Sequence, residues 1–296
     1  MSNEEKILEL ANGLMQLRNN PILVLNLKEI ESHTCFKIQE ELLGKKFKTL
    51  DVIIQTPGGD IDAAFNNVKL LRNSSKLINM IVPLYSKSAG TLMCIAGDSI
   101  IMATLAELGP LDTQIREEQE GGAPTYRSAL NGFKALEQVQ LHTLETMDIA
   151  AKLILQRSGM KISEAVTLAT KFSGSTSGTL YQQLDPTKIG EYARALEIGE
   201  RYGIIILTRY LNWAAEKADA VIKVLVKSYP GHGFVIDCDE LCSLGFPAKY
   251  ANEQEEKILN KMGRVLLKTK GNIIKLIEPQ KKASQKPNTK GIKGTK

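Results

Sequence analysis

The chain has few of the residues on which many active sites depend. Its 296 residues include three histidines, four cysteines and one tryptophan, and aromatic residues make up 5% of it. The four cysteines (Cys35, Cys94, Cys238, Cys242) show neither the spacing of a disulfide framework nor the two pairs of a zinc site. We therefore expect reduced thiols, no metal centre, and very few choices for a catalytic histidine.

Long apolar runs and a secretion signal are also lacking. No apolar run approaches the ~20 residues that span a bilayer, so we expect no transmembrane segment and a soluble, cytoplasmic protein. The net charge is +5, but Pro279–Lys296 holds six lysines and no acid, and subtracting these leaves about −1 for the rest. We expect a disordered basic tail at 279–296, with weak contact to an anionic surface as the alternative, and no specific nucleic-acid binding.

The remaining sequence, 43% apolar, is sufficient for a large core and predicts one domain over residues 1–275. Strand-like and helix-like segments alternate from Pro21 onward, which predicts α/β packing with crossover helices. Strands are expected at 22–27, 50–56, 79–86 and 99–104, and helices at 31–43, 60–71 and 89–97. Further helices are expected at 129–157 and across 188–228, the latter broken at Gly199 and Gly203, with a flexible or extended stretch at 117–126.

A proline and two glycines interrupt the chain between an expected strand and an expected helix. The stretch is TPGGDIDAAF, from Thr56 to Phe65. Without side chains at Gly58 and Gly59 a ligand can approach the backbone, and N–H groups at a helix start carry a partial positive field. The spacing fits neither phosphate-binding glycine motif, whereas an oxyanion hole needs only one or two such donors. A tight turn without a ligand is the alternative.

A second strand-to-helix junction follows one unit later, in YSKSAGTLM from Tyr85 to Met93. At such a junction a serine exposes its hydroxyl at the carboxyl end of the sheet, and the N–H of the next residue points into the same space. Ser88 is that serine, and Ala89 follows it. Since Ser86 stands where the nucleophile elbow G-x-S-x-G has glycine, a serine that caps the helix is the alternative explanation.

Together these motifs resemble the Clp-protease fold, which is shared by the ClpP peptidases, the signal-peptide-peptidase A family and the crotonases. Gly59 stands 29 positions before Ser88, the same separation as between the corresponding glycine and nucleophile of ClpP. With LGPLDTQ (108–114) and GHGFVIDCDELCSLGF (231–246), the match narrows to the SDH family of Clp-fold serine proteinases. The resemblance implies a ClpP/crotonase-like ββα superhelix, here with long additional helices.

The resemblance also guides the choice of the general base that a serine nucleophile requires. His232 lies between two glycines, in the place where ClpP has its triad aspartate, and Asp112 stands 24 positions after Ser88, about where ClpP has its histidine. The two roles are exchanged, which a triad defined by geometry permits. Asp112 is alternatively a turn residue, and His33 and His142 are expected to be structural or exposed.

A lysine base is the alternative, because the signal-peptide-peptidase relatives use one. Lys87, Lys134 and Lys188 are candidates by position, although none has a motif around it.

The sequence therefore predicts a serine endopeptidase without a cofactor. Ser88 attacks, His232 moves the proton, Asp112 orients the imidazole, and the N–H groups of Gly59 and Ala89 hold the oxyanion while Gly58 permits close approach. An extended peptide substrate would pair with the strand expected after Gly59 and Asp60 or with the loop near Leu111. A crotonase-like acyl-CoA enzyme and a non-catalytic scaffold are the alternatives.

The resemblance further implies a ring or compact homo-oligomer built from trimers or hexamers, and leaves an unfoldase or adaptor as a further partner. Apolar residues on several faces of 129–157 and of Tyr202–Trp213 favour burial against a neighbouring subunit. Burial within the monomer is the alternative.

Overall fold

The structure is a computed structural model that describes residues 1–111, 114–117, 125–231 and 233–279. Among the expected features, Asp112, His232 and the basic tail from residue 280 onward lie outside the described residues, as do 118–124 of the stretch expected to be flexible or extended.

A six-stranded sheet forms the centre of the molecule. In spatial order its strands are β10 (Ile273–Ile277), β1 (Ile22–Asn26), β2 (Phe47–Gln55), β3 (Ser75–Val82), β5 (Ser99–Met102) and β9 (Ala248–Tyr250). All neighbours are parallel except β10, which is antiparallel to β1. Every residue of β1 is buried, as expected of a parallel strand covered on both faces. The α/β fold with parallel strands and crossover helices is confirmed.

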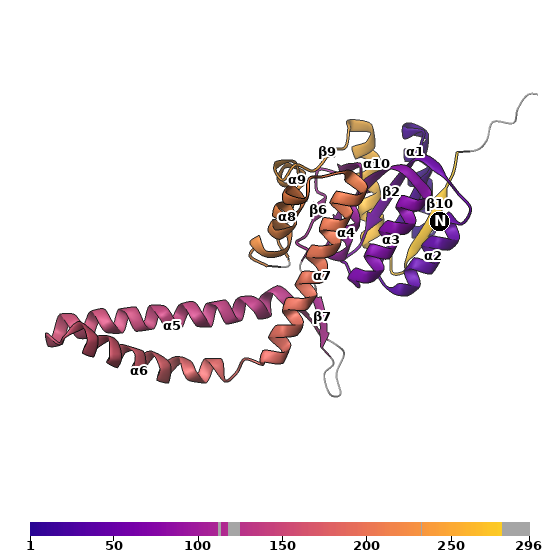
Figure 1. Ribbon diagram of the computed structural model, residues 1–296. Helices are drawn as coiled ribbons and strands as arrows, with labels where there is room; N and C mark the ends of the chain where they lie inside the picture. Colours follow the sequence, from indigo (N-terminus) through magenta and orange to yellow (C-terminus); the bar gives the residue numbers. More distant parts are fainter. Residues whose placement is uncertain (112–113, 118–124, 232, 280–296) are drawn as a thin grey trace, which may run out of the picture.

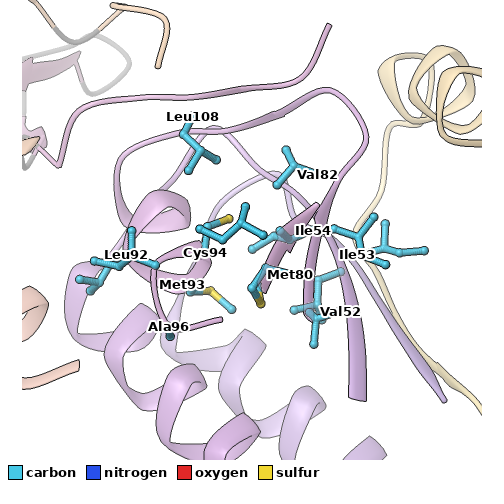
Figure 2. Close-up of a cluster of buried hydrophobic side chains, with 14 of the residues drawn as sticks. Val52, Ile53, Ile54, Met80, Val82, Leu92, Met93, Cys94, Ala96 and Leu108 are labelled. Atoms are coloured by element: carbon cyan, nitrogen blue, oxygen red, sulfur yellow. The ribbon is translucent and has the colours of Figure 1, made fainter. Parts of the chain in front are cut away.

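Helices cover the sheet in two pairs. Figure 1 shows the sheet between α1 (Asn3–Arg18) with α10 (Glu253–Leu267) and α2 (Ser32–Leu42) with α3 (Ile61–Ser74), and the members of each pair contact each other. The short helix α4 (Ala89–Cys94) packs against α3 and is buried along its whole length. Figure 2 shows side chains of β2, β3 and α4 gathered into one apolar cluster, among them Val52, Met80 and Leu92. This core fixes the positions of the strand ends that lead into the two turns of interest, the one with Gly58 and Gly59 and the one with Ser88.

The expected strand at 79–86 is wrong in its extent. β3 ends at Val82, and β4 (Tyr85–Ser86) is a separate strand that pairs in parallel with β6 (Glu107–Leu108). Pro83 lies between β3 and β4 and has no N–H to donate to a ladder, which explains the interruption. As a result, the segment before Ser88 leaves the main sheet and forms a small sheet of its own.

The second half of the chain is mainly helical. After β7 (Gln114–Glu117) and β8 (Thr125–Ser128) come α5 (Ala129–Ser158), α6 (Ile162–Tyr181), α7 (Pro186–Leu211), α8 (Ala215–Lys223), the π-helix η1 (Val224–Ser228) and α9 (Cys238–Ser243). Figure 1 shows α5 and α6 running side by side away from the α/β body as a hairpin. The hairpin returns to the body through α7, which packs on α3, α5 and α8.

The expected breaks at Gly199 and Gly203 are wrong, because α7 passes through both. The helix ends instead at Asn212, which takes the left-handed conformation at φ 55°. Gly203 serves packing, since a Cβ there would lie 2.6 Å from the Ile222 side chain of α8. Ile206 and Leu207 are fully buried within the chain, whereas Ile204, Ile205 and Leu211 of the same helix are only partly buried.

Candidate active site

The candidate site begins where β2 ends and the chain turns through Pro57, Gly58 and Gly59 into α3. Thr56 joins this turn to the serine-bearing segment: its N–H donates to the Tyr85 carbonyl (3.2 Å), and its carbonyl accepts from the Lys87 N–H (3.0 Å). The two turns that the sequence singled out are therefore hydrogen-bonded side by side.

Gly59 lies against a segment that the sequence did not link to the site. The Ile30 N–H donates to the Gly58 carbonyl (2.8 Å), and the Ile30 carbonyl accepts from the Asp60 N–H (2.7 Å). Gly59 has φ 141°, and a Cβ there would lie 2.4 Å from the Ile30 carbonyl oxygen. Only glycine fits this close parallel bridge between two backbone segments. α3 begins at Ile61, so the strand expected after Asp60 as a docking edge for substrate is wrong.

Gly58 lies against the serine itself. It has φ 118°, and a Cβ there would lie 2.9 Å from the Lys87 carbonyl oxygen and 3.0 Å from the Ser88 Cβ. A side chain at this position would occupy the space next to the candidate nucleophile.

Ser88 has a backbone conformation that non-glycine residues rarely adopt. It stands at the N-cap of α4 with φ 52° and ψ −119°, and is one of three non-glycine residues with positive φ among the described residues. Its side chain makes no capping hydrogen bond to α4, so the explanation of Ser88 as a helix-capping serine is wrong. Strain of this kind persists where the surroundings enforce it, and it is frequent at catalytic residues.

The backbone N–H groups of Gly59 and Ala89 are among those near Ser88 that make no hydrogen bond to another described residue. The neighbouring donors are engaged, since the Gly58 N–H donates to Thr56 Oγ1 (3.2 Å) and the Gly90 N–H to the Lys87 carbonyl (2.8 Å). Gly59 and Ala89 are the residues that the sequence predicts to hold the oxyanion, and this role stays a prediction.

Thr91 holds the junction together and was missed from the sequence. Its hydroxyl oxygen lies within hydrogen-bond distance of the carbonyls of Ser86 (3.0 Å) and Gly109 (2.8 Å), which share its single proton, and accepts from the Gly109 N–H (3.2 Å). Gly109 lies just after β6, so Thr91 ties α4 to both strands of the small sheet. Its place one turn after Ser88, in a run of small residues, was the available signal.

The segments that carry Asp112 and His232 both attach to this sheet. Leu111, next to Asp112, donates its N–H to the Leu225 carbonyl (2.8 Å), and Leu108 and Ile236 exchange two backbone hydrogen bonds (2.8 and 3.1 Å). Tyr229 and Phe234, on either side of His232, stack with ring centroids 4.7 Å apart. These contacts concern the described neighbours, and the roles of Asp112 and His232 stay predictions.

The lysine candidates differ in their surroundings. Lys87 is ion-paired with Glu107 (2.9 Å) and donates to the Leu108 carbonyl (3.1 Å). Lys134, on α5, donates to the Tyr229 carbonyl (2.8 Å), at the start of the segment that carries His232. Lys188 lies in the first turn of α7. His33 and His142 are exposed on α2 and α5.

One buried thiol, that of Cys94, lies at the far end of the short helix that begins after Ser88. Burial raises the pKa of the Cys94 thiol, at the end of α4, to about 12, so this group stays protonated at neutral pH. Ser86 is fully buried, whereas Ser88 is 6% exposed. Of the two serines in the motif, only Ser88 has a surface that another molecule can touch.

Comparisons with known proteins agree with the motifs. Residues 39–166 match the family model described as ClpP-like SDH-type serine proteinase. This segment includes Gly58, Gly59, Ser88, Ala89 and Asp112. His232 lies outside it.

Two curated relatives come from Methanocaldococcus jannaschii, and both are described as uncharacterized. MJ0137 is 40% identical over 111 residues, which are 38% of this chain and 37% of that protein. MJ1495 is 35% identical over 107 residues, 36% of this chain and 35% of that protein. The match thus spans little more than a third of the length of these relatives.

Similar solved structures include two of a 1510-N membrane-bound stomatin-specific protease: a serine-to-alanine mutant, and a lysine-to-alanine mutant in complex with a substrate peptide. They are 20% and 21% identical, with TM-scores of 0.28 and 0.29; each match covers 51% of this chain, and 70% and 67% of those chains. In the part of this chain that is described, no helix is long and apolar enough to cross a membrane. The family match agrees with the resemblance that the motifs predicted, and it is a match of residues 39–166 to the model of the ClpP-like SDH-type serine proteinases.

Proposed function

We propose that the chain is a serine endopeptidase that cleaves peptide bonds through an acyl-enzyme on Ser88. The observation that carries the proposal is the backbone of Ser88: φ 52° at a strand-to-helix junction, with a side chain that does not cap the helix. An ordinary turn gains nothing from this strain, whereas a nucleophile held above a helix N-terminus does. The family match over residues 39–166 supports the same chemistry.

In the proposed reaction Ser88 Oγ attacks the carbonyl carbon of the peptide and gives its proton to the base. The carbonyl oxygen becomes an oxyanion, which accepts hydrogen bonds from the N–H groups of Gly59 and Ala89. The base returns the proton to the leaving amine, and an ester to Ser88 remains. Water then attacks this ester, giving the base its proton, and Ser88 recovers a proton as the acid product leaves. The mechanism requires no cofactor.

His232 is the proposed base, with Asp112 orienting it, and Lys134 is the lysine alternative that the contacts favour. The Lys87 ammonium is engaged by Glu107 and the Leu108 carbonyl, whereas Lys134 reaches the loop segment 229–235 through the Tyr229 carbonyl. With His232 as base, kcat/KM rises through a pKa of about 6–7, and His232→Ala lowers it by several orders of magnitude. Activity that survives in His232→Ala and is lost in Lys134→Ala assigns the lysine instead.

The proposal is tested by labelling with a fluorophosphonate probe, which reacts with activated serines. The native chain is expected to label, and Ser88→Ala to abolish both labelling and peptide hydrolysis. Ser86→Ala is the matched control, since Ser86 is two residues away from Ser88 and fully buried.

Labelling that persists in Ser88→Ala, or that is lost equally in both variants, would exclude Ser88 as the nucleophile. A native chain that never labels favours the crotonase-like enzyme or the non-catalytic scaffold. The natural substrate, the cytoplasmic location, the homo-oligomer and an unfoldase or adaptor partner remain predictions alongside this one.

A further inference from the structure

The α5–α6 hairpin exposes a disproportionate share of the large apolar side chains. Among the described residues 22 large apolar side chains are exposed, and eleven of them lie between Leu141 and Tyr181. Monomeric proteins rarely leave such a concentration uncovered.

The large apolar side chains are exposed because of the order of residues in α6, where small residues are buried and large apolar residues are exposed. Its buried residues are small and recur every four positions: Ala165, Ala169, Ser173 and Ser177. This small-residue stripe faces α5, as shown by the hydrogen bond from Ser173 Oγ to the Thr143 carbonyl (2.7 Å). The large apolar residues of α6 are consequently left outside the contact between the two helices, available to another molecule.

Four of these apolar residues share one face of the hairpin. Thr170 Oγ1 contacts Met147 Sδ (3.7 Å), so these two residues mark one flank of the contact between α5 and α6. A residue two positions away on a helix points roughly 200° around it, that is, to the other flank.

Ile149 follows Met147 by two positions, and Leu168 and Phe172 stand two positions on either side of Thr170, so all three lie on the flank opposite to the Thr170–Met147 contact. Leu153 is one turn beyond Ile149 on the same stripe. We call Ile149, Leu153, Leu168 and Phe172 the hairpin patch; all four are exposed.

Charges beside the patch repeat the same pattern on both helices. On α5 an acid precedes a base by seven residues, Glu145 and Lys152, and on α6 Glu164 and Lys171 have the same order and spacing. The midpoint of the first pair falls between residues 148 and 149, and that of the second between 167 and 168.

The two midpoints lie at the same height along the axis of the α5–α6 hairpin. Thr143 is opposite Ser173 and Met147 is opposite Thr170. In this antiparallel register the point between 148 and 149 faces the point between 167 and 168. A single twofold axis can therefore cross both midpoints.

We infer that a second copy of this chain covers the hairpin patch, with the two hairpins antiparallel about this axis. The axis places α5 against α5 of the partner copy and α6 against its α6, with the four apolar residues of each copy between them. Glu145 of each copy then faces Lys152 of the other, and Glu164 faces Lys171. A twofold axis along the helices would instead place α5 of one copy on α6 of the other and set Glu145 opposite Lys171, an arrangement that the charge exchange described below distinguishes from the antiparallel one.

Lys152 is ion-paired within its own helix to Asp148, and both side chains are more than half exposed. Such a pair contributes little and leaves Lys152 able to exchange partners. Glu145, Glu164 and Lys171 make no ion pair within the described part of the chain.

The test is the mass of the full chain in solution, by sedimentation equilibrium at micromolar concentration. We expect a mass of at least twice the 32.6 kDa of one chain. Ile149→Asp is expected to raise the dimer dissociation constant at least about 100-fold, because it places a charge in the apolar centre of the contact. Leu144→Asp is the matched control: Leu144 has the same exposure as Ile149, 59%, but lies three positions before Met147, on the flank of the Thr170–Met147 contact and away from the hairpin patch.

Charge exchange tests the antiparallel register. Glu145→Lys alone and Lys152→Glu alone each set like charges opposite each other across the axis and are expected to weaken the dimer about tenfold. The double variant restores opposite charges and is expected to recover the native constant. A monomeric native chain, equal effects of Ile149→Asp and Leu144→Asp, or a double variant no stronger than the single ones would each overturn the proposal. No readout depends on peptidase activity, so the result is independent of the proposed function.

Discussion

Replacing Gly59 by alanine tests whether the backbone segments of Ile30 and Gly59 are packed as closely as the structure indicates. Two penalties combine. The φ of 141° lies in a region that only glycine adopts without strain, which costs about 1–3 kcal/mol for alanine. The new Cβ would also lie 2.4 Å from the Ile30 carbonyl oxygen and 2.5 Å from the Ile30 nitrogen, and since both are backbone atoms the strands must separate. Overpacking of this kind costs about 1–3 kcal/mol more.

We therefore expect Gly59→Ala to lower the free energy of unfolding by about 2–6 kcal/mol, measured by urea denaturation with both circular dichroism and tryptophan fluorescence. Two other glycines separate the contributions. Gly44 has φ 69° and open space around its Cβ position, so Gly44→Ala carries the strain alone. Gly13 lies within α1 with open space, and Gly13→Ala is expected to stabilise the chain by about 0.5–1 kcal/mol.

The order of the three variants in unfolding free energy shows whether the close contact with Ile30 is costly. A Gly59→Ala variant no less stable than Gly44→Ala would show that Ile30 yields without cost, and the argument for a rigid Gly59 N–H would fail. In the expected case, the variant that still folds also loses about 10²–10³ in kcat, because the displaced N–H no longer meets the oxyanion.

Three further outcomes follow from the same structure. Thr91→Val leaves the buried polar groups of Ser86 and Gly109 without a partner and should cost about 1–3 kcal/mol in urea denaturation, whereas Thr91→Ser should cost less; equal losses would contradict the bridging role. Ser88→Gly should unfold at higher urea than Ser88→Ala, because glycine relieves the strain at φ 52°, and the opposite order would show that no strain is stored there. Burial raises the pKa of Cys94 to about 12, and the hydrogen bond to Asp62 together with burial raises that of Tyr202 to about 12. Because the unfolded chain loses these protons at lower pH, stability should fall as pH rises from about 9 towards 12, and a urea midpoint that stays constant over this range would refute the shifts.

The sequence was most informative where local pattern and tertiary structure agree. The apolar run at 22–27 and the glycine turn at 56–61 predicted β1 and the start of α3 closely, because a fully buried strand and a strand-to-helix turn have strong local signals. Ser88 was identified by the same reasoning, although whether its hydroxyl caps the helix was a question of geometry that the sequence could not answer.

Features that depend on distant contacts could not be predicted in this way. The contact between Ile30 and Gly59 joins residues 29 positions apart, and nothing near Ile30 marks it as part of the site. Gly203 signals a break by its propensity, yet packing against Ile222 keeps α7 intact. The edge strand β10 pairs with β1 from the other end of the chain, a partnership that no local pattern specifies.

The hydrogen bonds between Leu108 and Ile236, and between Leu111 and Leu225, bear on how the protein is made. During translation the serine-bearing segment leaves the ribosome long before residues 225–236 exist to bind it. The small sheet of β4 and β6 is thus completed only when more than three quarters of the chain has been synthesised. If Ser88 is the nucleophile, as proposed, the segments beside its turn therefore lack these backbone hydrogen bonds until residues 225–236 have been made.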